Sequence, residues 1–110
     1  MNDVLIYNLT IDHGSDYSVH FRFEDDDDTP ISLAGWTVEA TLREFPECHV
    51  GIDFLPIADS EGIHLYLSST DTENLGYQYG VYDVFITTPD NNCRVQIVTG
   101  RTHIRARSAR

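Results

Sequence analysis

A two-residue alternation of apolar and polar side chains recurs along this chain of 110 residues and narrows its possible folds more than any motif does. The alternation is clearest where Tyr17, Val19, Phe21 and Phe23 are interleaved with polar or charged residues. Successive side chains of a β-strand point to opposite faces of its sheet. The pattern therefore predicts a strand across residues 17–24 with one face in a core and the other in solvent.

The same alternation predicts further short strands separated by turn residues. These strands span residues 4–11, 36–43, 50–57, 63–68, 82–86, 93–99 and 102–106, with Gly100 separating the last two. The polar run at residues 68–74 predicts one helical turn, since Ser69 or Thr70 can cap it and Glu73 lies three residues after Thr70. Roughly seven to eight strands at this spacing predict an all-β domain, either an antiparallel sandwich or a small barrel.

Residues 75–86 combine leucine, glycine and several tyrosines immediately before an alternating run. Such a stretch is typical of the place where the chain of a β-sandwich crosses from one sheet to the other. A tyrosine there can bury its ring in the core while its hydroxyl hydrogen-bonds to backbone upstream. The stretch therefore favours a sandwich and indicates no reaction.

The chain is strongly acidic, and its few basic residues are unevenly placed. It has 18 acidic and 7 basic residues, all of the latter arginine, for a net charge of −11. Four arginines lie in the last ten residues, namely Arg101, Arg105, Arg107 and Arg110. An acidic body repels nucleic acid and anionic membranes, so we expect neither as a partner. The basic tail predicts docking onto another acidic protein surface, such as a neighbouring copy, or is simply solvated.

No residue pattern in the sequence indicates catalysis or a cofactor. The five histidines lack the spacing of zinc ligands, and His20 and His64 meet only if their strands are neighbours in a sheet. Cys48 and Cys93 form no C-x-x-C pair and are expected to be thiols. No serine or cysteine has the sequence context of an activated nucleophile. We therefore expect a non-enzymatic protein with no cofactor and no catalytic residues.

Asp25, Asp26, Asp27 and Asp28 form the run that best suggests a metal site. Calcium takes about six to eight oxygen ligands, and acidic loops can supply them. Consecutive aspartates point in different directions, however, and no glycine supplies the sharp bend of a calcium-binding loop. We expect a solvated loop that protects the sheet from edge pairing, with calcium binding as the alternative.

Several aromatic residues are candidates for a binding surface. They are Tyr66, Tyr77, Tyr79 and Phe85, of which Tyr66 and Phe85 fall on the polar phase of their strands. Exposed aromatic rings can stack on sugars, and they are also enriched in the centres of protein interfaces. We expect a contact patch for a protein partner, together with the four C-terminal arginines, and keep carbohydrate binding as the alternative.

The order of these signals resembles a known family. The resemblance is carried by residues 12–23, by the connector at 29–37 (Thr-Pro-Ile-Ser-Leu-Ala-Gly-Trp-Thr), by residues 63–75, by Tyr79-Gly80-Val81-Tyr82-Asp83-Val84, and by residues 98–102. These segments are similar to the recurring "G-x-x-φ", "P-φ-D-L-T-G", "φ-x-L-S-x-x-D-T-x-x-L" and "G-x-Y-x-Y-D-φ" patterns of small immunoglobulin-like domains in tailed-phage virion proteins. The N-terminal domain of baseplate upper proteins is a notable example, and the resemblance covers about residues 8–104.

The resemblance implies a fold, a role and a location. The fold would be an immunoglobulin-like antiparallel β-sandwich of seven to eight strands over residues 1–104, with a basic tail at residues 105–110. The role would be structural, as a tail, baseplate or fibre-attachment adaptor or a particle decoration, with other virion proteins as partners and a homo-oligomer or ring as the assembled form. The location would be the virion, assembled in the host cytoplasm. A carbohydrate- or calcium-binding sandwich is the alternative, and an inhibitor whose acidic surface mimics nucleic acid is a third possibility.

Overall fold

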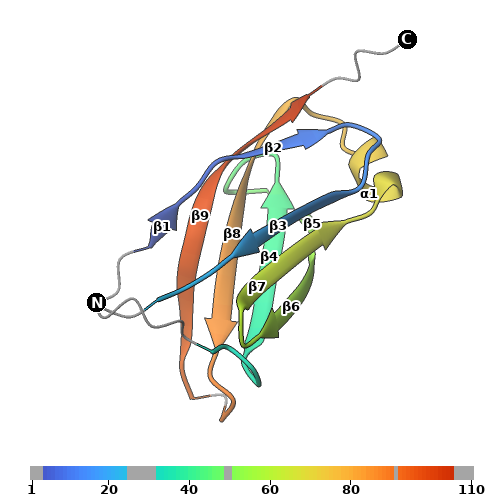
Figure 1. The fold of residues 1–110 in the computed structure, drawn as a ribbon. Helices are drawn as coiled ribbons and strands as arrows, with labels where there is room; N and C mark the ends of the chain where they lie inside the picture. The colour runs from blue at the N-terminus through green and yellow to red at the C-terminus, as the bar shows by residue number, and fades with distance from the viewer. Residues whose placement is uncertain (1–3, 25–31, 49–50, 91, 106–110) are drawn as a thin grey trace.

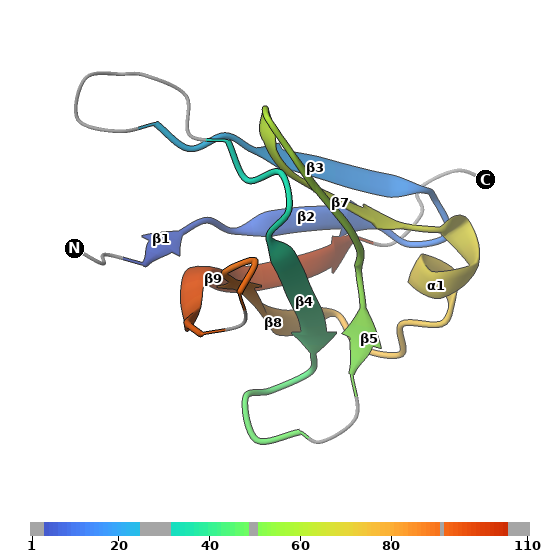
Figure 2. The same cartoon turned by 90° about the horizontal axis from the view of Figure 1, so that it is seen from below.

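The computed structural model describes residues 4–24, 32–48, 51–90 and 92–105 of the chain. Within these ranges the chain forms nine strands and one short helix, arranged as two sheets packed face to face (Figures 1 and 2). The elements are β1 (Leu5–Ile6), β2 (Leu9–Asp12), β3 (Tyr17–Phe21), β4 (Thr37–Arg43), β5 (Ile52–Asp53), β6 (Leu55–Asp59), β7 (Gly62–Leu67), α1 (Ser69–Glu73), β8 (Tyr79–Thr87) and β9 (Arg94–Arg105). The predicted all-β sandwich is confirmed.

The two sheets differ in size. In the larger sheet the strands follow the order β1-β9-β8-β4-β5, with β2 also paired to β9, and in the smaller sheet they follow the order β3-β7-β6. The chain therefore alternates between the sheets, with β3, β6 and β7 in one layer and β4, β8 and β9 in the other. This alternation is the strand arrangement of immunoglobulin-like sandwiches.

The N-terminal edge of the larger sheet departs from the antiparallel pairing expected from the sequence. β1 and β2 both run parallel to β9, with Leu5 opposite Val98 and Leu9 opposite Thr102. The single strand expected over residues 4–11 is therefore two strands, interrupted at Tyr7 and Asn8. At the interruption the Asn8 side chain replaces a backbone acceptor of the strand pairing, because its Oδ1 accepts a hydrogen bond from the Arg101 amide at 3.0 Å.

The sequence suggested that Gly100 ends a strand, but β9 continues through it from Arg94 to Arg105. A Cβ at position 100 would clash with the carbonyl oxygen of Tyr7. Glycine is therefore present because the N-terminal segment passes close against β9, and not because the strand stops.

The strand expected at residues 50–57 is also divided, because the chain changes sheets there. β5 pairs with β4 in the larger sheet, and β6 pairs with β7 in the smaller one. Phe54 lies at the crossing, is 2% exposed, and donates its amide to the carbonyl of Ala40 at 2.9 Å. The helical turn expected at residues 68–74 is confirmed as α1, but its N-cap is Ser68, whose side chain accepts from the Asp71 amide.

The core lies between the sheets and is built from apolar side chains of both. Its buried members are Leu9, Ile11, Phe21, Leu33, Val38, Ala40, Leu42, Phe54, Ile63, Leu65, Leu67, Leu75, Tyr82, Val84, Ile86, Val98 and Ile104. Tyr82 of β8 is fully buried, and its hydroxyl donates to the carbonyl oxygen of Tyr7 at 2.5 Å. A tyrosine of the 75–86 stretch thus places its ring in the core and bonds to upstream backbone, as its sequence predicted.

Replacing Tyr82 with phenylalanine tests this bond. The Tyr82→Phe variant keeps the ring but leaves the Tyr7 carbonyl without that donor, so the free energy of unfolding should fall by about 1–3 kcal/mol. Denaturant unfolding measures the change. The control is Tyr79→Phe, since Tyr79 is 62% exposed; equal losses in the two variants would refute the role given to Tyr82.

Two buried threonines provide an opposed pair of predictions. Within the described residues the Thr102 hydroxyl has no hydrogen-bond partner, whereas the Thr72 hydroxyl accepts from the Gly14 amide at 3.0 Å and lies 2.9 Å from the Ser15 carbonyl oxygen. Thr102→Val should raise the free energy of unfolding by about 1 kcal/mol, and Thr72→Val should lower it by about 1–3 kcal/mol. Thermal or denaturant unfolding distinguishes the two, and a destabilising Thr102→Val would show that the Thr102 hydroxyl is not an unsatisfied buried group.

Candidate functional site

The structure does not bring the predicted aromatic contact residues into one patch. Tyr66 lies on the outer face of the smaller sheet, on β7, whereas Tyr79 and Phe85 belong to the outward positions of β8 in the larger sheet. Tyr77 precedes β8 and packs, half-buried, against the core. Burial raises the pKa of Tyr77, with further contributions from Glu44 and Cys48. These four residues therefore cannot contact one partner through a single flat surface.

The outer face of the larger sheet is covered by polar contacts within the chain. The Arg94 guanidinium lies 4.0 Å from the centre of the Phe85 ring and also pairs with Glu39 at 2.6 Å. Tyr79 stacks on His103, with ring centroids 5.1 Å apart. Asp83 accepts from Gln96 and Thr99 at 2.7 and 2.9 Å. Because Arg94 already covers Phe85, this ring offers little open surface.

The predicted arginines have different roles. Arg105 pairs with Asp12 at 2.7 Å and so joins the ends of β9 and β2. This hydrogen bond lowers the pKa of the Asp12 carboxyl. Arg101 is exposed on β9. Arg107 and Arg110, like the calcium candidates Asp25, Asp26, Asp27 and Asp28, lie outside the described residues.

The outer face of the smaller sheet carries the exposed apolar side chains nearest to Tyr66. Leu55 is 64% exposed, Ile57 45% and Tyr66 38%, and Leu55 stands directly opposite Tyr66 in the β6–β7 pairing. We call these three residues the outer-face patch. Leu55 and Ile57 were not predicted as contact residues, because Pro56 between them is also apolar and the run shows no polar phase.

Two histidines flank the outer-face patch and meet each other. His20 and His64 stand opposite each other in the β3–β7 pairing, and their rings stack with centroids 4.1 Å apart. His20 Nε2 lies 2.7 Å from the Glu61 carbonyl oxygen, and His64 Nε2 lies 3.3 Å from an Asp59 carboxylate oxygen. His20 and His64 therefore meet because their strands, β3 and β7, are neighbours in the smaller sheet.

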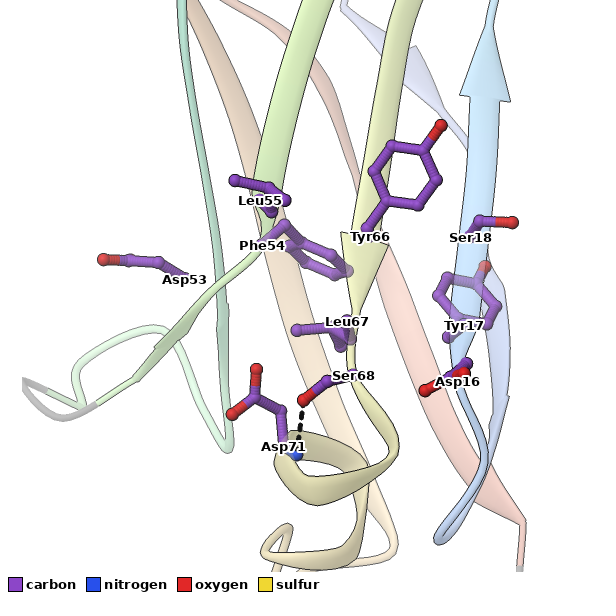
Figure 3. A pocket seen from close by; sticks show the side chains of 10 residues that line it. All are labelled: Asp16, Tyr17, Ser18, Asp53, Phe54, Leu55, Tyr66, Leu67, Ser68 and Asp71. Atoms are coloured by element: carbon purple, nitrogen blue, oxygen red, sulfur yellow. Dashed lines mark hydrogen bonds between the residues drawn. The ribbon is translucent and has the colours of Figure 1, made fainter.

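A pocket of about 620 Å³ opens beside the outer-face patch, at the end of the smaller sheet where α1 lies (Figure 3). Its lining comes from three segments: the start of β3, the crossing between β5 and β6, and the end of β7 with α1. Phe54 and Leu67, each 2% exposed, form its apolar base. Tyr66 is its aromatic wall on the outer face, Tyr17 borders it from the start of β3 with its ring on the core side, and Leu55 is shared with the patch.

The pocket also contains three carboxylates, each in a different setting. Asp16 Oδ1 accepts from the Ser69 amide at 2.7 Å, and Asp53 Oδ1 accepts from the Thr41 hydroxyl at 2.9 Å. Figure 3 shows the Asp53 side chain turned away from the pocket, whereas those of Asp16 and Asp71 border its α1 end. This combination of aromatic rings and carboxylates attracts cationic or polyhydroxylated groups and repels anions.

Comparisons with known proteins add no family to this geometry. The chain matches no family model and no curated protein sequence. Over the described ranges, no helix is long and apolar enough to cross a membrane. In the same ranges, no group of three or more histidine, cysteine, aspartate or glutamate side chains could hold a metal ion, and neither cysteine belongs to a disulfide.

The partly buried Tyr17 hydroxyl gives the stability of the fold a measurable pH dependence. Burial, with a smaller contribution from the nearby Tyr7, raises the pKa of Tyr17 from 10.0 to about 12. The contribution of neutral Tyr17 to stability should therefore be complete below about pH 10 and be lost as the pH rises toward about 12. Stability curves over this range should fall less steeply for Tyr17→Phe than for the wild type, and identical slopes would disprove the assignment.

Proposed function

We propose that this chain is a non-enzymatic assembly protein of a tailed-phage virion. In this role it is a tail, baseplate or fibre-attachment adaptor, or a particle decoration, and it binds other virion proteins through the outer-face patch. The observation that carries the proposal is the exposure of Leu55, Ile57 and Tyr66 on one regular sheet face. The resemblance of residues 8–104 to phage immunoglobulin-like domains supports the setting.

The outer-face patch has the character of an interface centre. Exposed apolar side chains that are contiguous on a regular surface mark contact sites more often than isolated ones do. A sheet face also offers a flat surface on which another sheet can pack. The stacked histidines and Ser18 form a polar border on the β3 side, as in interfaces with an apolar centre and a polar rim.

The charge of the chain favours a partner with a different surface. At a net charge of −11, two copies repel each other unless specific contacts oppose the repulsion. A virion partner with basic residues around an apolar site would match both the patch and the surrounding acidic groups. The proposed partners are therefore other virion proteins, with self-association requiring an additional, charge-matched contact.

A carbohydrate-binding module is the second candidate, and the pocket is the observation that favours it. Tyr66 could stack on a sugar ring, and Asp16 and Asp71 could accept hydrogen bonds from its hydroxyls. Thermal stabilisation of the purified chain by a glycan would support this candidate. Particle incorporation that depends on the outer-face patch would favour the assembly role instead.

The double variant Leu55→Ser, Ile57→Ser tests the assembly role. Phage particles produced from the genome that encodes the chain should contain the wild-type protein and about tenfold less of this variant, because the centre of the interface is lost. Quantitative mass spectrometry of purified particles measures the incorporation. Circular dichroism of the purified variant establishes that it folds.

The matched control changes two exposed apolar residues elsewhere. Ile6 is 73% exposed on β1 and Val95 is 42% exposed on β9, so Ile6→Ser, Val95→Ser makes the same chemical change outside the patch. This control should be incorporated at the wild-type level. Particles without the wild-type chain, despite its expression as a folded protein, would overturn the proposed function.

A further inference from the structure

We infer that the pocket beside α1 binds an arginine side chain from residues 106–110 of a second copy of this chain. The inference rests on the proposed function in one respect, namely that copies of the chain meet in an assembly. It goes further in naming both sides of a contact between them. The receptor is the pocket of one copy, and the ligand is the segment that contains Arg107 and Arg110 in the next.

The lining of the pocket suits a guanidinium group. An arginine side chain presents a planar cation that stacks on aromatic rings and donates paired hydrogen bonds to carboxylates. Tyr66 supplies an exposed ring, and the apolar base can cover the methylene stem. Asp16 and Asp71 supply carboxylates that come from different segments, the turn before β3 and the helix α1 respectively, and both border the same end of the pocket (Figure 3).

The size of the pocket also favours a side chain over a bare ion. Its volume of about 620 Å³ falls in the usual range for pockets that hold organic groups. Among the described residues, no cluster of three carboxylate, imidazole or thiol groups is close enough to hold a metal. The carboxylates are therefore suited to an extended cation with an apolar stem.

The arginines of the folded domain mostly have carboxylate partners of their own. The pairs are Arg22–Glu24 at 3.8 Å, Arg43–Asp83 at 3.9 Å, Arg94–Glu39 at 2.6 Å and Arg105–Asp12 at 2.7 Å. The chain has no lysine, so Arg107 and Arg110 are the cations that follow β9. Charge complementarity therefore matches this segment to the acidic pocket.

The direction of β9 favours a pocket on another copy. Arg105 is fixed at the end of the strand, because its side chain pairs with Asp12 and its carbonyl accepts from the His13 amide at 3.0 Å. Figure 1 shows the arrow of β9 pointing out of the end of the sandwich, and Figure 2 shows β9 and β3 in different layers. Five residues span at most about 17 Å when extended, so the segment after Arg105 has a short reach.

A contact between the tail of one copy and the pocket of the next joins two different surfaces. Such heterologous contacts repeat from copy to copy and generate a ring if the rotation closes. The pocket therefore supplies the charge-matched contact that self-association of an acidic chain requires. The rotation that this contact imposes between neighbouring copies would determine how many copies the ring contains.

The test uses two full-length variants that each lack one side of the contact. Arg107→Gln, Arg110→Gln removes the cations and keeps the pocket, whereas Asp16→Asn, Asp71→Asn weakens the pocket and keeps the cations. Asparagine preserves the Oδ1 acceptor that the Ser69 amide uses at position 16. Each variant alone should be monomeric by light scattering at concentrations where the wild type associates, and a mixture of the two should form one-to-one pairs.

A peptide of residues 104–110 measures the same contact directly. It should bind the Arg107→Gln, Arg110→Gln chain, and Asp16→Asn, Asp71→Asn introduced into that chain should weaken the binding about tenfold or more. Replacing both Arg107 and Arg110 of the peptide with citrulline, which is uncharged, should have a similar effect. The matched control is Glu47→Gln, Glu61→Gln, which removes two exposed charges outside the pocket and should change the affinity less than about twofold.

Several results would overturn the inference. They are a wild-type chain that stays monomeric at every concentration, a mixture that forms no pairs, and peptide binding that is indifferent to Asp16 and Asp71. Ile57→Ser, which lies in the outer-face patch but not in the pocket, should leave pairing intact. Because Leu55 lines both surfaces, Ile57→Ser is the variant that separates the two proposals: its particle incorporation reports on the patch, and its pairing reports on the pocket.

Discussion

The hydrogen bond from the Tyr82 hydroxyl to the Tyr7 carbonyl links the interior of the sandwich to its N-terminal edge. The ring of Tyr82 is fully buried between the sheets, so its hydroxyl can be satisfied only by a group that comes close to the core. Tyr7 meets that requirement because Gly100 leaves room for its backbone. The N-terminal segment then continues as β2 along β9 to the Asp12–Arg105 pair, which fixes where the turn into β3 begins.

The position of the pocket follows from the same path of the chain. After Asp12 the turn brings Gly14 and Ser15 against Thr72, whose hydroxyl contacts the backbone of both. This joins the β2–β3 turn to α1, and Asp16 adds a second link through the Ser69 amide. On the other side, the buried Phe54 fixes the crossing from β5 to β6. The three segments that line the pocket are thus held by contacts that serve the fold as well.

The sequence was informative about strands and uninformative about which strands pair. Alternation located β3, β4 and β7 closely, because each has one face in the core and one outside. It could not indicate that β1 and β2 run parallel to β9, since pairing direction depends on segments about 90 residues apart and leaves no local pattern. Gly100 illustrates the limit: a glycine that admits a neighbouring backbone and one that ends a strand look alike in a sequence. The pocket was unpredictable for a related reason, because its residues come from segments with no common motif.

The outer-face patch and the pocket share Leu55 and Tyr66, so the two proposed contacts cannot be independent. A partner on the patch and an arginine in the pocket would both touch the Tyr66 side chain. Binding of one would either fix this side chain in the position that the other needs, or occupy the surface that the other needs. Salt separates the two cases physically. Screening weakens the attraction between arginine and carboxylates, but it also weakens the repulsion between acidic bodies that opposes packing on the apolar patch. An assembly held mainly by the pocket therefore loosens as salt rises, whereas one held mainly by the patch tightens.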